Sequence, residues 1–209
     1  MAPLTGALLT LLLSVNPAVS FVIPFVGLGQ IVGPLSNGLL DLNLNPGPCP
    51  TGVQVIAARG TDQGWPFGPA MQLLATSILK EIPGSPAIGV VYPATNGIPT
   101  YVVSETLGVQ DMTAYIKYFA QRCPNTPQVI VGYSQGAQVV MDAVCGISAP
   151  SWPTQTAELP AAYQHNVKAV VVYGDPSHKI NMPYDRGTST HNGVSTDTGL
   201  ARLTPSFTD

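Results

Sequence analysis

The sequence predicts an α/β fold, a three-layer sandwich in which helices cover both faces of a mostly parallel central sheet. Two observations predict it. Four short runs rich in Val and Ile recur along the chain, and their apolar residues are continuous, which is typical of strands buried on both faces of a parallel sheet. Segments with apolar residues at helical spacing separate these runs, and strands that alternate with helices form βαβ units.

The expected strands cover residues 53–58, 88–92, 129–133 and 167–173, and the first, second and fourth end before Arg59, Pro93 and Gly174. Three helices are expected between them, over residues 69–82, 104–122 and 135–145, where apolar residues recur every three or four positions. Cys123-Pro124 is a stop signal for the second helix. Because no internal repeat or linker interrupts this part of the chain, we expect one domain over residues 49–194.

The composition excludes several classes of protein. The 209 residues are 45% hydrophobic and 9% charged, with a net charge of −3. A disordered chain needs fewer apolar residues and a higher net charge. Eight basic residues spread along the chain form no patch that could neutralise phosphates, so we expect no nucleic-acid partner. The three histidines lack metal-ligand spacing, so we expect no metal and no cofactor.

The N-terminal segment has no charged side chain before Asp41. Residues 7–15 are apolar, and Ala18-Val19-Ser20 offers the small residues that signal peptidase requires, so we expect a secretory signal peptide over residues 1–20. The alternative is a membrane anchor that continues to Val32, but prolines and glycines interrupt that run and its apolar part is too short for a bilayer. Residues 21–48 predict an irregular arm or a propeptide.

The main chemical motif is Gly132-Tyr133-Ser134-Gln135-Gly136, which has the form G-x-S-x-G. It follows an expected strand and opens an expected helix, as a nucleophile elbow requires. The two glycines let the backbones approach closely, and Ser134 then stands at the carboxyl edge of the sheet, where α/β folds bind ligands. The backbone N–H of Gln135 can stabilise an oxyanion. The alternative is that Ser134 only caps the helix.

A second oxyanion donor is expected on a loop that follows an earlier strand. Arg59-Gly60-Thr61 directly follows the first expected strand. Thr61 can donate its backbone N–H, and its hydroxyl is a further donor. The alternative is that these residues form a plain turn.

Seven short motifs follow one another along the chain, namely Cys49-Pro50, Ala58-Arg59-Gly60-Thr61, Tyr92-Pro93-Ala94, Cys123-Pro124, the Ser134 motif, Cys145-Gly146 and Gly174-Asp175-Pro176. Together they resemble the cutinase and acetylxylan esterase family of secreted, mainly fungal, serine esterases, from about Cys49 to about Val194. The resemblance implies an α/β-hydrolase-like fold, with Ser134 as nucleophile and Thr61 and the Gln135 backbone as oxyanion hole. It also implies a disulfide between Cys49 and Cys123.

The chain departs from that family after Gly174-Asp175-Pro176. The resemblance implies that the catalytic acid and base lie well beyond this element, the acid in a disulfide-closed loop. No cysteine and no such motif follows, so we expect a C-terminally incomplete fold and an unmatched, disordered tail over residues 195–209. If the implied disulfide forms, Cys145 is the cysteine left over. We expect its partner in the missing segment, and the alternative is a buried thiol.

A substitute triad of Ser134, Asp175 and either His178 or His191 would have the required order along the chain. The competing interpretation is that Asp175 is a turn residue at the end of a strand and that the histidines occupy solvated loop positions. We favour the competing interpretation. His165 precedes the fourth expected strand and is a weaker candidate than either.

These observations together predict a secreted, extracellular, monomeric carboxylic-ester hydrolase that acts through an acyl-enzyme on Ser134. The sparse charge suits a neutral polymeric ester, either acetylated polysaccharide such as xylan or a cutin-type polyester, with a slight preference for xylan. No stable membrane association is expected. The alternative is a catalytically impaired or inactive product that lacks the triad Asp and His and at most binds its substrate.

Overall fold

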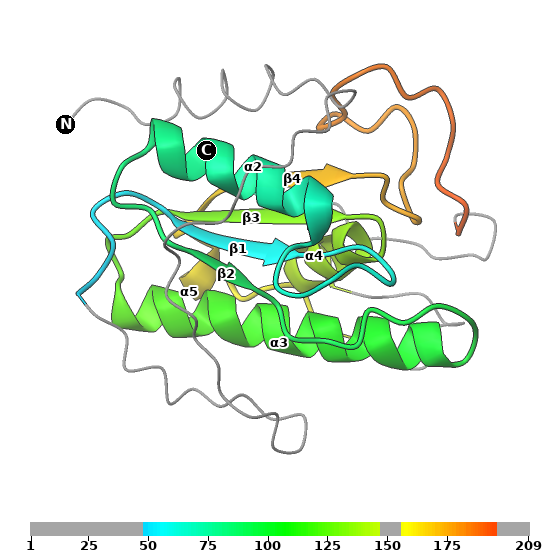
Figure 1. The fold of residues 1–209 in the computed structure, drawn as a ribbon, viewed down its shortest axis with the longest axis horizontal. Coiled ribbons are helices and arrows are strands. Elements are labelled where there is room, and N and C mark those ends of the chain that lie inside the picture. The colour runs from blue at the N-terminus through cyan, green and yellow to red at the C-terminus, as the bar shows by residue number, and fades with distance from the viewer. Residues whose placement is uncertain (1–47, 147–155, 196–209) are drawn as a thin grey trace.

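The computed structural model describes residues 48–146 and 156–195 (Figure 1). Their elements in chain order are β1 (Gln54–Ala58), α2 (Gly68–Glu81), β2 (Ala87–Gly89), α3 (Thr100–Arg122), β3 (Gln128–Tyr133), α4 (Gln135–Cys145), α5 (Ala161–Gln164) and β4 (Val167–Tyr173). The expected signal peptide over 1–20 lies outside these residues. Of the expected arm over 21–48, the structure describes only residue 48. Of the expected tail over 195–209, it describes only residue 195.

The four strands form one parallel sheet in the order β2-β1-β3-β4. β1 and β3 lie in the centre and are almost wholly buried, whereas β4 lies at one end of this sheet and is largely half-buried. Because all strands run in the same direction, their carboxyl ends meet at one edge, on the right of Figure 1. The predicted α/β class and parallel sheet are therefore confirmed.

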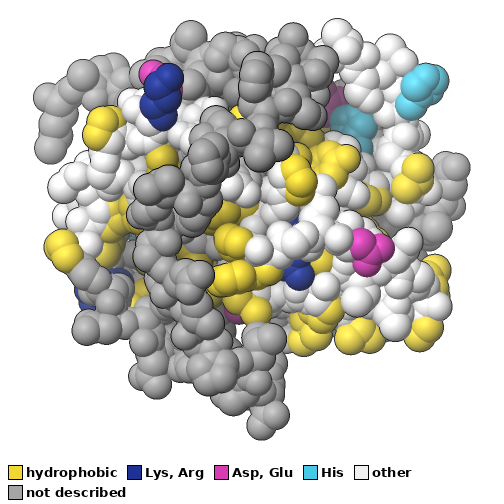
Figure 2. Space-filling model, in the orientation of Figure 1, with side chains coloured by type: hydrophobic (Ala, Val, Ile, Leu, Met, Phe, Trp, Pro, Cys, Tyr) yellow, Lys and Arg dark blue, Asp and Glu magenta, His cyan; other side chains and the backbone are white. Residues whose placement is uncertain are grey.

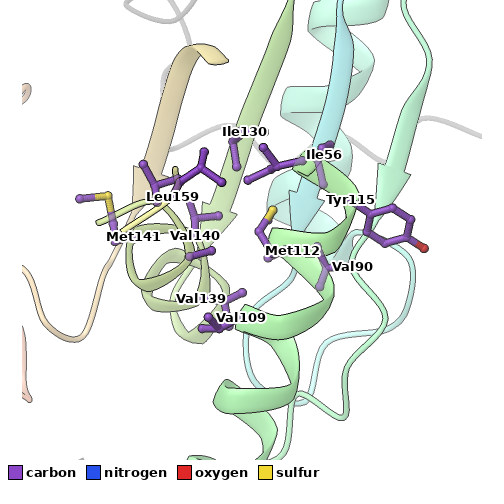
Figure 3. Packing of buried hydrophobic residues seen from close by; sticks show 14 of the residues in the cluster. Ile56, Val90, Val109, Met112, Tyr115, Ile130, Val139, Val140, Met141 and Leu159 are labelled. Atoms are coloured by element: carbon purple, nitrogen blue, oxygen red, sulfur yellow. The ribbon is translucent and has the colours of Figure 1, made fainter. Parts of the chain in front are cut away.

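Helices cover both faces of the sheet. α2 packs on one face, against a cluster that includes Val55 and Val131, and α3 and α4 pack on the other, against Ile56 and Ile130. Figure 3 shows the second cluster, in which Met112 of α3 and Val140 of α4 point toward the strands. Successive residues of a strand face opposite sides, so a continuous apolar run feeds both cores at once. This is the predicted three-layer arrangement.

Two expected boundaries differ from the structure by three residues or more, and the others differ by one residue or agree. The second strand ends at Gly89 instead of residue 92, because Val91 turns its N–H to the Asp111 carboxylate of α3, 2.8 Å away. α3 begins at Thr100 instead of residue 104. The short helix α5 had no signal in the sequence, and its four residues include no buried side chain that would impose a helical pattern.

The disulfide implied by the family resemblance is present between Cys49 and Cys123, which are 74 residues apart in sequence. It ties the segment before β1 to the end of α3. Cys145 is a buried thiol outside this disulfide. Within the two described ranges, no helix has the length and apolar character needed to span a membrane.

Candidate active site

Ser134 lies in the sharp turn between β3 and α4. Its backbone has a φ of +54° and a ψ of −121°, and residues other than glycine rarely adopt a positive φ. Its N–H donates to the Tyr173 carbonyl at 2.9 Å, and its own carbonyl accepts from Ala137 and Gln138. The Ser134 side chain makes no capping hydrogen bond to α4. Its strained backbone is thus held from both sides, and its hydroxyl is left for another use.

The two glycines of the motif are required by close packing. A Cβ on Gly132 would overlap with the Gly136 carbonyl oxygen, and a Cβ on Gly136 would overlap with the carbonyl oxygens of Ala58 and Arg59. The start of α4 therefore lies directly against the end of β1. Because Ala58 pairs with Gly132 in the sheet, Ser134 and the loop after β1 share the same edge.

The loop after β1 is a tight turn in which three of four consecutive N–H groups are hydrogen-bonded. Gly60 donates to Gln63 Oε1 at 3.0 Å, Asp62 donates to the Ala94 carbonyl at 2.7 Å, and Gln63 donates to the Gly60 carbonyl at 3.2 Å. The N–H of Thr61 has no acceptor among the described residues. Thr61 is half-buried, and its N–H is a candidate donor to a bound group.

The N–H of Gln135 is the first of α4, and the first N–H groups of a helix have no acceptor inside it. Its side chain is fully buried and joins the elbow to the loop between β2 and α3. The Gln135 amide donates to the Thr95 carbonyl at 3.1 Å and accepts from Ser104 Oγ at 3.3 Å, while Thr95 N–H donates to Ser104 Oγ at 3.1 Å. The sequence had no signal for this ring of hydrogen bonds, because its members lie on three separate segments.

A second polar contact joins α3 to α4 next to this ring. The Tyr101 hydroxyl donates to Gln138 Oε1 at 2.9 Å. Burial, followed by the nearby Glu105 carboxylate, raises the pKa of Tyr101 well above its usual range, so the hydroxyl stays protonated and keeps donating. The N-terminal part of α3 is thereby held against α4.

The histidines do not complete a triad among the described residues. His178 Nδ1 lies 3.7 Å from Asp185 Oδ1, and His191 is exposed on the loop after β4. Asp175 Oδ1 accepts from the N–H and the hydroxyl of Ser177, both at 2.9 Å, as expected for a turn residue. No hydrogen bond joins either imidazole to Ser134 or to the Asp175 carboxylate within residues 48–146 and 156–195. The same residues contain no group of three or more His, Cys, Asp or Glu placed to hold a metal ion.

Comparison with known proteins shows the family of this chain. The family model described as Cutinase matches residues 48–206. The chain belongs to the cutinase family. The match begins next to the expected boundary at Cys49 and runs past the boundary expected at Val194.

Individual proteins that are similar to this chain include cutinases and acetylxylan esterases. The chain is similar to Cutinase 11 from Verticillium dahliae, with 39% identity over 70% of this chain and 52% of that protein. It is also similar to Acetylxylan esterase 2 from Talaromyces purpureogenus, with 29% identity over 83% of this chain and 74% of that one. The chain thus spans about half the length of the first relative.

A solved structure of the same family resembles the fold. The catalytic core domain of acetyl xylan esterase from Trichoderma reesei matches with a TM-score of 0.62 and 35% identity, over 68% of this chain and 72% of that one. The similarity leaves part of each chain unmatched, so activity and substrate are inferred from the site itself.

Proposed function

We propose that this chain is a carboxylic-ester hydrolase in which Ser134 is the nucleophile and the N–H groups of Thr61 and Gln135 form the oxyanion hole. One observation carries the proposal. A strained serine stands between a strand and a helix, at the sheet edge that also carries two N–H groups with no acceptor among the described residues. Strain of this kind persists only where the surroundings impose it, and it is typical of functional sites.

The reaction that fits these groups is acyl transfer. The Ser134 oxygen attacks the ester carbonyl carbon while its proton passes to a base, and the carbonyl oxygen becomes an oxyanion that accepts from Thr61 and Gln135. Collapse of this intermediate breaks the ester bond, releases the alcohol and leaves an acyl group on Ser134. Water then attacks the acyl carbon and releases the acid, which restores the serine hydroxyl.

The proposed substrate is a neutral polymeric ester outside the cell, either acetylated polysaccharide or a cutin-type polyester. The names of the relatives, cutinase and acetylxylan esterase, support this pair. On the face shown in Figure 2, the charged side chains of the described residues stand in small separate groups among uncharged ones. A surface with so few grouped charges suits a neutral polymer better than a charged one. The disulfide and the expected signal peptide support a secreted protein, proposed to act as a monomer.

The placement of the described histidines favours a second candidate function. No described imidazole is hydrogen-bonded to Ser134. A serine site without its base keeps only the contributions of the oxyanion hole and of binding, which are roughly 10³- to 10⁴-fold over water. The second candidate is therefore a chain that binds esters and hydrolyses them slowly.

The test uses the full chain with 4-nitrophenyl acetate, with and without added imidazole as an external base. We expect slow hydrolysis that depends on Ser134 and rises with imidazole more steeply in the wild type than in Ser134→Ala. Subtraction of the Ser134→Ala rate removes the direct reaction of imidazole with the ester. Equal rates in the two proteins at every imidazole concentration would refute the proposal. Fast turnover without imidazole would refute the second candidate.

The substrate class is tested by acyl length. Release of acetate from acetylated xylan is compared with hydrolysis of 4-nitrophenyl esters of longer acids, under the same conditions. A rate that falls steadily with acyl length supports the acetylated polysaccharide, and a rate that holds or rises supports the cutin-type polyester. Neither result changes the assignment of Ser134.

A further inference from the structure

Arg59 is a buried cation at the end of β1, with 6% of its surface exposed. Its Nε donates to the Gln63 carbonyl at 2.8 Å. The terminal nitrogens donate to three carbonyls of the segment after β2, at 3.4 Å to Val90, 2.5 Å to Tyr92 and 3.3 Å to Pro93. Every acceptor is therefore a backbone carbonyl, drawn from two different loops.

Tyr92 binds Arg59 from the opposite side. The Arg59 guanidinium lies 4.9 Å from the centre of the Tyr92 ring, in a cation–π contact, and the Tyr92 hydroxyl donates to the Arg59 carbonyl. Burial raises the pKa of Tyr92 above its usual range, so the hydroxyl remains a donor. The same Arg59 carbonyl lies against Gly136 of the elbow. Arg59 thus contacts both the turn that carries Thr61 and the residue that follows Gln135.

No carboxylate pairs with this guanidinium in the described part of the chain. Buried charges are usually paired, because removal of a charge from water is costly. Here carbonyl dipoles and one aromatic ring replace the missing anion, and the guanidinium cannot lose its proton in a protein. The positive charge of Arg59 therefore remains buried two residues from Thr61.

We propose that Arg59 is a positioning residue of the oxyanion hole. Its Nε bond to Gln63 closes the turn that presents the Thr61 N–H, and its remaining bonds fix that turn to the segment after β2. Its buried charge favours negative charge at the site when the oxyanion develops. This inference rests on the proposed role of Ser134, since an oxyanion forms only if Ser134 attacks.

The experiment measures how fast a fluorophosphonate probe modifies Ser134 in the full chain, at fixed imidazole, over a range of probe concentrations. The phosphoryl oxygen of the probe occupies the oxyanion hole when serine displaces fluoride. Arg59→Lys keeps the charge but loses the planar fork, and the two are not interchangeable at such a site. Arg59→Gln loses both. Lys80→Gln, on the exposed end of α2, removes one positive charge elsewhere and is the matched control.

We expect the limiting rate at saturating probe to fall about tenfold in Arg59→Lys and further in Arg59→Gln, because small misplacements of catalytic groups cost up to about 10²-fold. The probe concentration for half-maximal rate should change less than twofold. Lys80→Gln should react like the wild type. Equal limiting rates in the wild type and both Arg59 variants would overturn the inference, whereas a wild type that is not modified at Ser134 would overturn the proposed function.

A loss of folding must be told apart from a loss of positioning. Ile78→Ala removes a fully buried side chain from the α2 core and leaves every Arg59 contact in place. All proteins are assayed in sucrose, which favours the folded state, with folding followed by circular dichroism. If Ile78→Ala loses stability but keeps its limiting rate, the drop in the Arg59 variants reflects positioning. If its limiting rate falls as far as that of Arg59→Lys, the inference is wrong.

Discussion

Asp111 offers a test of how burial in this fold sets stability against pH. Its carboxylate lies partly buried on α3 and accepts the Val91 N–H at 2.8 Å. Burial raises the pKa of Asp111 from 3.8 to about 6, although the Val91 hydrogen bond opposes the rise. Because the folded state then holds this proton more tightly than the unfolded state, stability falls as the pH rises from 3.8 to about 6.

The magnitude follows from the size of the shift. A rise of about two pKa units corresponds to at most about 3 kcal/mol, and partial exposure of the carboxylate lowers that figure. Asp111→Asn keeps an oxygen for the Val91 N–H and cannot ionise. The variant should therefore match the wild type near pH 4 and exceed its free energy of unfolding by one to about 3 kcal/mol above pH 7.

The assay is urea unfolding of both proteins, with the disulfide intact, at intervals from pH 4 to pH 8. The difference between the two free energies isolates the Asp111 carboxylate from other titrating groups. Asp62→Asn, at an exposed carboxylate, is the control and should show no such rise. A difference that stays constant with pH, or a wild type that becomes the more stable protein as the pH rises, would refute the reasoning.

Two further predictions concern the scaffold. Gly136→Ala should destabilise the fold by about 1–3 kcal/mol, because the new methyl group overlaps with backbone oxygens, while Gly64→Ala, with open space around it, should leave urea unfolding nearly unchanged. Equal effects of the two substitutions would contradict the packing described here. The double substitution Cys49→Ser with Cys123→Ser removes the disulfide that closes a loop of 74 residues. In the chain-entropy model this disulfide contributes about 4 kcal/mol to the free energy of unfolding. We therefore expect the double variant to unfold at a lower temperature than the wild type when thermal unfolding is measured. Equal unfolding temperatures would show that the disulfide adds no stability.

Much of the fold could be predicted because it depends on local patterns. The helix over Gln135–Cys145 and the strand over Val167–Tyr173 have the expected boundaries, since the helix has apolar residues at helical spacing and ends before Gly146, and the strand is a Val-rich run that ends before Gly174. β2 was expected to be longer, because Val90 and Val91 extend the apolar run. A distant carboxylate on α3 takes the Val91 N–H, and no local pattern reports such a contact.

The candidate site also contains residues that a local motif predicted and residues whose role depends on distant contacts. Ser134, Gln135 and the glycines of the elbow form one motif, and this motif together with the strand and helix expected on either side of it predicted a nucleophile. Thr61 was a weaker prediction, because an unbonded N–H in a turn is visible only once its neighbours have found their acceptors. The disulfide between Cys49 and Cys123 was implied by family resemblance and is present. The assignment of Ser134 and Thr61 to catalysis stays a prediction until the variants are assayed.

By itself, the sequence determined the class of the fold, the succession of its four strands and three longer helices along the chain and the residue types at the elbow, because apolar periodicity and glycine placement act over a few neighbouring residues. Only the tertiary structure decided which groups meet at the sheet edge. Arg59 lies in a loop motif that seemed relevant only for Thr61, yet it collects carbonyls from a segment about thirty residues later. Such a contact depends on β1 and β2 lying side by side, and a buried charge finds its acceptors only after the sheet has formed.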